Sequence, residues 1–285
     1  MSVTEIPVVF PCASEHLVGI IHRPPKPKGH GVLAIVAGGP QYRGGCCRQL
    51  VHIARTFSTA GYPVMRFDYR GLGDGSGSYQ GFLHIGPDIQ AAVETFCKHV
   101  PEMEGVVLWG GCDAASACLI HGPALPRVRG MILGNPFVHT EASHAKVVVR
   151  HYYLTRLREG AFWRKLLGLR LNPFKAAATL VKNVIATRIG STVAQGEKYR
   201  SDIPFPELMR RGAETFDGRT LMFMSGLSLV SKEFDELVNS SRPWQAALSK
   251  LKPTRVDIPD ADQAFSTAGA RDEIERRSLE WIKEL

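Results

Sequence analysis

The stretch "VVLWGGCDAASACL", residues 106–119, constrains the fold more than any other part of the sequence. An apolar, β-branched run ends in two glycines, Cys112 follows, and small residues of helical character continue the chain. This order is typical of a nucleophile elbow, a sharp strand-to-helix turn that exposes a nucleophilic side chain. Small residues two positions before and after Cys112 allow such a turn to close. The stretch therefore predicts a thiol at a helix N-terminus, in the position of a nucleophile.

Short apolar runs elsewhere in the chain predict a sheet around this turn. They cover residues 32–37, 63–68, 106–109, 130–134, 220–225 and 254–258. Apolar residues spaced three and four apart indicate helices between the early runs. Strands that alternate with helices predict a parallel sheet covered on both faces. Residues 17–24 indicate an antiparallel entry strand, and residues 270–285 an amphipathic closing helix.

Two other glycine-rich turns follow predicted strands, at "AGGPQYR" (37–43) and "RFDYRGLGDGSG" (66–77). In the first turn, the backbone N–H of Gly39 or of its neighbours is expected to face a developing oxyanion, together with the N–H of Asp113. These two turns and the elbow, in this order and spacing, predict the α/β-hydrolase fold with a mostly parallel central sheet.

A long basic segment interrupts the alternation of strands and helices. We expect residues 138–218 to form a helical cap inserted into a core of residues 1–137 and 219–285. The stretch from Lys146 to Arg219 contains 15 Lys or Arg and 6 Asp or Glu, so it accounts for the whole net charge of +8. Two interpretations stay open: a solvated helical surface, or a face for an acidic partner such as an acyl carrier, a coenzyme A phosphate or an anionic membrane. Nucleic acid is not expected, because no recognition motif accompanies the charge.

Composition and the N-terminal residues indicate a cytoplasmic protein. The 285 residues are 44% hydrophobic, which is enough for one large core. The first 15 residues have neither the basic nor the apolar region of a secretory signal, and no apolar run approaches the roughly 20 residues of a membrane span. The 6 cysteines lack metal-ligand spacing and are expected to be reduced thiols, so no metal or organic cofactor is expected.

Several stretches resemble the exosortase A system-associated hydrolase 1 family, a cytosolic branch of the α/β-hydrolases in bacteria that make PEP-CTERM proteins and exopolysaccharide. The stretches are "VAGGPQYR", "RFDYRGLGDGSG", "LWGGCDAAS" and "GNPF", with "HYYLTRL" and "FWRKLLG" further along. The resemblance extends from about residue 5 to the C-terminus. It implies action on an ester-like or thioester-like substrate.

The same resemblance implies that the catalytic triad is degenerate. The family has an aspartate after a late strand, where this chain reads "MSGLSLVSKEF" with Ser228 at that position. The family histidine follows the last strand, where this chain reads "DADQAFS" with Gln263. All 10 histidines lie at or before His151, so none can occupy the usual position of the base.

Two interpretations of Cys112 stay open. In the first it is a nucleophile that hydrolyses or transfers acyl groups slowly, helped by a helix N-terminus that can lower a thiol pKa from about 8.5. Gln263 can then orient water but cannot accept its proton. In the second the chain is a pseudo-hydrolase that binds an acyl ligand or a protein partner. We expect Gln41, His151 and Tyr152 to line the pocket, and a replacement base is sought among His84, His139, His144 and His151. Asp113 itself is interpreted as a helix N-terminal charge.

Overall fold

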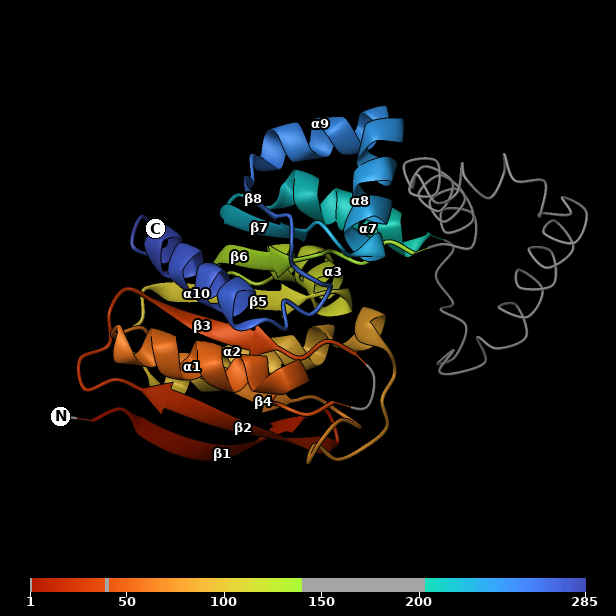
Figure 1. Cartoon of the computed structure of the whole chain (residues 1–285). Coiled ribbons are helices and arrows are strands. Elements are labelled where there is room, and N and C mark those ends of the chain that lie inside the picture. Colours follow the sequence, from red (N-terminus) through yellow and green to blue (C-terminus); the bar gives the residue numbers. More distant parts are fainter. Residues whose placement is uncertain (1, 39–40, 140–202) are drawn as a thin grey trace, which may run out of the picture. The chain divides into compact units, whose positions relative to one another are not determined.

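The computed structural model describes residues 2–38, 41–139 and 203–285. The strands are β1 (Thr4–Cys12), β2 (Glu15–Arg23), β3 (His30–Ile35), β4 (Val64–Asp68), β5 (Gly105–Gly111), β6 (Val128–Gly134), β7 (Arg219–Ser225) and β8 (Thr254–Ile258). They form one sheet in the order β1-β2-β4-β3-β5-β6-β7-β8 (Figure 1). The first two pairings, β1 with β2 and β2 with β4, are antiparallel, and the others are parallel. The predicted mostly parallel sheet is therefore confirmed.

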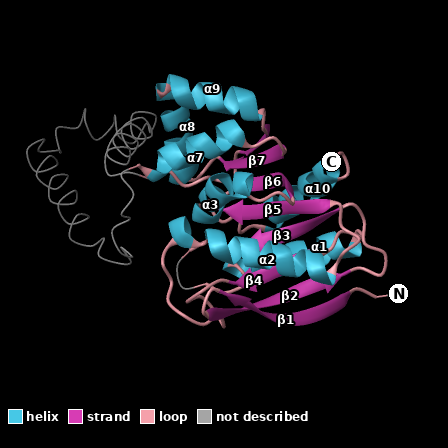
Figure 2. Cartoon of the chain, turned by 180° about the vertical axis from the view of Figure 1, so that it is seen from behind, coloured by secondary structure: helices cyan, strands magenta, loops and turns pink. Residues whose placement is uncertain are grey.

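The helices cover both faces of this sheet. They are α1 (Gln49–Thr59), α2 (Gly86–His99), α3 (Asp113–His121), α7 (Phe205–Thr215), α8 (Leu229–Ser240), α9 (Arg242–Leu251) and α10 (Ala268–Ile282), with short 3-10 turns η1 (Cys46–Arg48), η2 (Phe82–His84) and η3 (Gly122–Ala124). Helices α1 and α10 contact each other in front of the sheet in Figure 1. In the reversed view, α2, α3 and α7 lie in front of it (Figure 2). None of the helices in the described ranges has the length and apolar character that a bilayer crossing requires.

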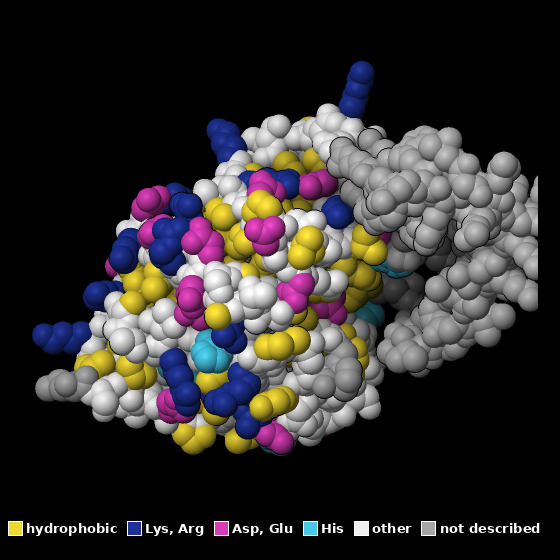
Figure 3. Space-filling view, in the orientation of Figure 1, with side chains coloured by type: hydrophobic (Ala, Val, Ile, Leu, Met, Phe, Trp, Pro, Cys, Tyr) yellow, Lys and Arg dark blue, Asp and Glu magenta, His cyan; other side chains and the backbone are white. Residues whose placement is uncertain are grey.

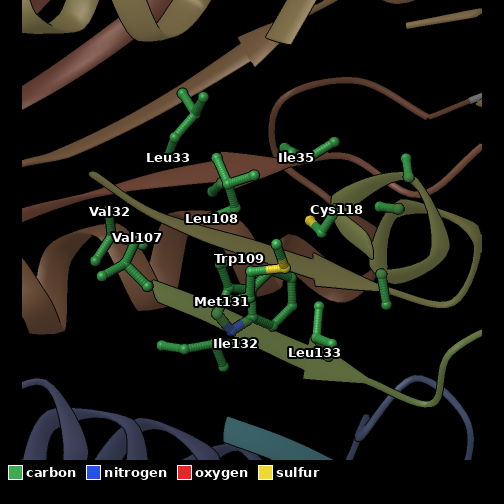
Figure 4. Packing of buried hydrophobic residues seen from close by; sticks show 14 of the residues in the cluster. Val32, Leu33, Ile35, Val107, Leu108, Trp109, Cys118, Met131, Ile132 and Leu133 are labelled. Carbon is green, nitrogen blue, oxygen red and sulfur yellow. The ribbon is translucent and has the colours of Figure 1, made fainter. Parts of the chain in front are cut away.

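The inner strands are apolar along their whole length because both of their faces are covered. All six residues of β3 are buried, as are the first six of β5. Their side chains pack with those of β6 and with Cys118 of α3 (Figure 4). In β1, by contrast, buried and exposed residues alternate, which is typical of an antiparallel strand with one face in water.

The parallel register brings the carboxyl ends of six strands to one edge of the sheet. The last pairs are Ala34 with Arg66, Ile35 with Gly110, Gly111 with Gly134, Gly134 with Phe223, and Ser225 with Ile258. The loops that follow β4, β3, β5, β6, β7 and β8 therefore start side by side. In open parallel sheets this edge is where ligands bind.

The predicted cap falls mostly on residues 140–202, which lie outside the described residues. The last part of the predicted cap range forms α7, which packs closely against α3. A Cβ on Gly212 of α7 would lie 1.8 Å from the carbonyl oxygen of Leu119 in α3.

Over the face drawn in Figure 3, basic and acidic side chains are interspersed.

We expect the substitution Gly212→Ala to lower the free energy of unfolding by about 1–3 kcal/mol, because the added methyl group forces α7 away from α3. Urea unfolding followed by circular dichroism measures this loss. Gly269→Ala is the matched control, since a Cβ on Gly269 of α10 meets nothing within 4 Å. Equal effects of the two substitutions would show that α7 does not depend on this close approach.

Candidate active site

Cys112 lies at a strained turn between β5 and α3. Its φ of 53° and ψ of −123° are uncommon for a residue other than glycine. The backbone N–H of Cys112 donates a hydrogen bond to the Gly134 carbonyl at 2.8 Å, and its carbonyl accepts one from the Phe137 N–H at 3.3 Å. A Cβ on Gly110 would lie 2.7 Å from the backbone of Ala114, so this position requires glycine. The turn has the geometry of the predicted elbow.

The side chain of Gln263 contacts the thiol. It lies on the loop between β8 and α10, and its Nε2 donates a hydrogen bond to the Cys112 Sγ at 3.3 Å. The structure thus brings together two residues 151 positions apart that the sequence places in one site. Because an amide N–H can donate but not accept, Gln263 favours a negative charge on sulfur yet cannot take the thiol proton.

Asn135, which the sequence analysis did not single out, holds this loop in place. It follows β6 with φ 47° and is fully buried. Its Oδ1 accepts hydrogen bonds from the Ser225 N–H at 2.9 Å and the Ser231 hydroxyl at 2.5 Å. Its Nδ2 donates to the Gln263 carbonyl at 3.0 Å. The "GNP" after an apolar run was a usable signal, because Asn adopts positive φ more readily than most residues.

Ser228, at the position where the family resemblance implies a triad acid, has a structural role. It lies between β7 and α8, only 2% exposed. Its Oγ accepts hydrogen bonds from the backbone N–H groups of Val230 and Ser231 at 3.1 and 3.4 Å. Serine is among the preferred residues for such a helix N-cap. Among the described residues, no hydrogen bond joins Ser228 to Gln263.

In the turn where the sequence predicts oxyanion donors, one backbone N–H is bound to a carboxylate. Gly39 lies outside the described residues, but the N–H of its neighbour Gly38 donates to both oxygens of Asp113, at 2.8 and 2.9 Å. Burial raises the pKa of Asp113 above its usual value. Burial, with the charge of Asp113 as a smaller cause, also raises the pKa of Tyr79 to about 12.

The thiol of Cys112 ionises less readily than a free thiol. Burial first, and then the neighbouring charge of Asp113, raise its pKa to about 11. The backbone N–H of Asp113 and the Gln263 amide lower it by less. Any lowering of this pKa by the helix N-terminus is therefore smaller than the increase caused by desolvation, which disfavours the charged form.

His139, a candidate for a replacement base, lies beside a buried carboxylate. It follows β6, and its Nδ1 lies 3.2 Å from the buried Glu233 carboxylate of α8. The Phe137 ring stacks on the His139 ring at a centroid distance of 6.0 Å. Among the described residues, Gln263 alone hydrogen-bonds the Cys112 sulfur, so no such bond links His139 to it.

The remaining predicted site residues are less informative. Gln41 is half-buried on the loop after β3, and among the described residues no hydrogen bond joins it to Cys112 or Gln263. His84 lies in η2. His144, His151 and Tyr152 lie outside the described residues. Within the described ranges, no group of three or more His, Cys, Asp or Glu side chains has the arrangement of a metal site.

No protein-family model matches this sequence, and no curated protein matches it either. Solved structures do. An esterase of Pyrococcus furiosus matches with a TM-score of 0.64 and 13% identity, over 99% of this chain and 93% of that one. A dienelactone hydrolase of Anabaena variabilis matches with a TM-score of 0.59 and 14% identity, over 100% of this chain and 99% of that one.

A third structure, an α/β serine hydrolase without a lid from Xanthomonas campestris, has a TM-score of 0.56 and 15% identity, over 97% of this chain and 94% of that one. At such low identity, these likenesses concern the fold alone. Together with the strand order, they show that this chain has the α/β-hydrolase fold that the sequence predicted.

The raised pKa of Cys112 predicts an unusual pH profile for its alkylation. Iodoacetamide reacts with the thiolate, so the alkylation rate of folded protein should rise about tenfold per pH unit from about pH 7 to pH 10. The Cys112 peptide, quantified by mass spectrometry, measures this rate. In urea-unfolded protein the rate should level off near pH 9, as for an ordinary thiol. A folded protein that levels off at the same pH would contradict the raised pKa of about 11.

Proposed function

We propose that this α/β-hydrolase-fold protein reacts with ester-like or thioester-like acyl compounds through Cys112, and that the acyl-cysteine is hydrolysed slowly or passed to an acceptor. The observation on which this rests is the hydrogen bond from the Gln263 Nε2 to the Cys112 Sγ, at 3.3 Å. In this proposal Cys112 is the nucleophile, and the group beside it, Gln263, is a hydrogen-bond donor. Rapid turnover would require a base in that place.

Acylation by a thioester needs no strong base in this site. The Cys112 sulfur attacks the carbonyl carbon, a new sulfur–acyl bond forms, and the carbon–sulfur bond of the substrate breaks. The thiol proton leaves with the departing sulfur, which becomes a free thiol. The Gln263 amide stabilises the thiolate form of Cys112 before it attacks, because its N–H donates a hydrogen bond to the sulfur.

Deacylation by water is the slow step in this proposal. Water must give up a proton as it attacks, and an amide cannot accept that proton. An amine or thiol acceptor is a better nucleophile than water at neutral pH and depends less on such help. The site therefore favours acyl transfer or a long-lived acyl-enzyme over fast hydrolysis.

Two likenesses support this chemistry. Structural neighbours of the same fold include an esterase and a dienelactone hydrolase. The motifs that resemble the exosortase A system-associated hydrolase 1 family point to the same class of substrate. We extend the proposal to a cytoplasmic acyl donor with an acidic carrier, because the stretch from Lys146 to Arg219 holds the excess of basic residues.

We expect incubation with the acetyl thioester of N-acetylcysteamine to give an acetyl adduct on Cys112 with little turnover. Intact mass and peptide mapping detect the adduct, and a thiol assay of released N-acetylcysteamine measures turnover. Cys112→Ser is the matched control and should give neither at a comparable rate. Fast turnover that survives this substitution would refute the proposal. Ligand binding with no adduct would favour the second candidate, a pseudo-hydrolase that only binds acyl compounds.

The missing base should be restorable. We expect Ser228→Asp combined with Gln263→His to raise p-nitrophenyl acetate turnover by about a hundredfold or more, the usual contribution of a general base. Aspartate also serves as an N-cap, so the start of α8 is retained. Gln263→His alone separates the base from its orienting acid. No gain from the double variant would show that the site lacks more than the two replaced residues.

A further inference from the structure

Asp113 is a half-buried carboxylate whose role the proposed reaction does not explain. Both of its oxygens accept a hydrogen bond from one donor, the Gly38 N–H, at 2.8 and 2.9 Å. The approach is close: a Cβ on Gly38 would lie 2.2 Å from the Asp113 Oδ2 and 2.6 Å from the Tyr79 hydroxyl. The position of Gly38 therefore requires a glycine, and the contact is built into the loop after β3.

The negative charge of Asp113 has no partner of opposite charge in the described part of the chain. No Lys, Arg or His there forms an ion pair with it, and only backbone N–H groups, those of Gly38, Ala114 and Asp113 itself, stabilise its charge. Both Asp113 and the adjacent Cys112 remain partly exposed to solvent. A ligand that reaches the thiol thus meets a carboxylate without a cationic partner, in surroundings that strengthen electrostatic interactions.

The carboxylate also occupies a backbone donor at the oxyanion side of the site. The Gly38 N–H belongs to the turn after β3 that the fold uses to stabilise negative charge. Here it already binds a negative group of the protein itself. Negative charge from the ligand is therefore disfavoured by repulsion and by the loss of one donor.

We propose that Asp113 makes the site selective for acyl compounds with a positive charge next to the reacting carbonyl, such as aminoacyl thioesters. This proposal rests on the proposed function, because it names the substrate class of the same thiol. A ligand ammonium group offsets the charge of Asp113, the smaller of the two causes that oppose ionisation of Cys112. Acylation is therefore faster with a cationic ligand than with a neutral or an anionic one.

The alternative role of Asp113 is structural. It is the first residue of α3, where a negative charge complements the helix dipole. Such a role affects stability but not the charge preference of the neighbouring thiol. Charge selectivity at Cys112 is therefore the property that separates the two roles.

Methanethiosulfonate reagents measure this selectivity without any acyl chemistry. Each forms a disulfide with the Cys112 sulfur and releases methanesulfinate, and the aminoethyl, methyl and sulfonatoethyl reagents are cationic, neutral and anionic. The experiment uses a variant in which Ser replaces Cys46, Cys47 and Cys97, so that these thiols do not react. The remaining cysteines besides Cys112 are buried. The rate of each reagent with Cys112 is divided by its rate with free N-acetylcysteine, which corrects for the intrinsic reactivity of the reagent. We expect this corrected rate to be about tenfold to a hundredfold higher for the cationic reagent than for the anionic one.

The substitution Asp113→Asn should remove most of this difference, while Asp272→Asn, an exposed charge change on α10, should leave it unchanged. If Asp113→Asn does not fold, salt provides the test on the unaltered site: about 1 M NaCl should reduce the ratio of cationic to anionic rates. An equal ratio with and without Asp113, or a ratio insensitive to salt, would overturn the proposal.

Acyl substrates complete the test. Glycyl, acetyl and succinyl thioesters of N-acetylcysteamine should acylate Cys112 in that order of rate, and Asp113→Asn should level the three rates. If Cys112 is acylated without charge preference, the selectivity proposal is wrong and the proposed function stands. If none of the three acylates Cys112, the proposed function is wrong, and the aminoacyl substrate class falls with it.

Discussion

The hydrogen bonds of Asn135 fix the loop that carries Gln263. Among the described residues, Gln263 is the only one whose side chain hydrogen-bonds the Cys112 thiol. One side chain joins the end of β6, the end of β7 and the loop after β8, through Ser225, Ser231 and the Gln263 carbonyl. The Gln263 amide reaches the Cys112 sulfur because its loop is held at this point. The parallel register supplies the frame, since it aligns the ends of the strands from which these loops start.

The chemistry of the site follows from three groups around one sulfur. Gln263 and the Asp113 N–H favour a negative sulfur, whereas burial and the Asp113 carboxylate oppose it, and the second pair prevails. Ser228, at the position that the family resemblance implies for a triad acid, binds backbone groups of α8. The groups around Cys112 therefore favour its protonated form over the thiolate.

Local patterns predicted what depends on local chemistry. The inner strands were recognisable because strands covered on both faces are continuously apolar, and the elbow because its glycines are required at fixed positions. Strand β1 was missed: Pro7 and Pro11 argue against a strand, although an edge strand tolerates them. The contact of Asp113 with Gly38 joins residues 75 positions apart, and the raised pKa of Cys112 depends on its burial in the folded chain; no local pattern reports either of them.

We propose that Cys112 is acylated faster than its acyl form is hydrolysed, since Gln263 is a donor without basic character. Rapid-mixing kinetics with p-nitrophenyl acetate separate these two steps. We expect a burst of p-nitrophenol close to one equivalent of protein, followed by a much slower steady rate, with the burst absent in Cys112→Ser. Linear release from the first turnover, at a rate unaffected by that substitution, would contradict it.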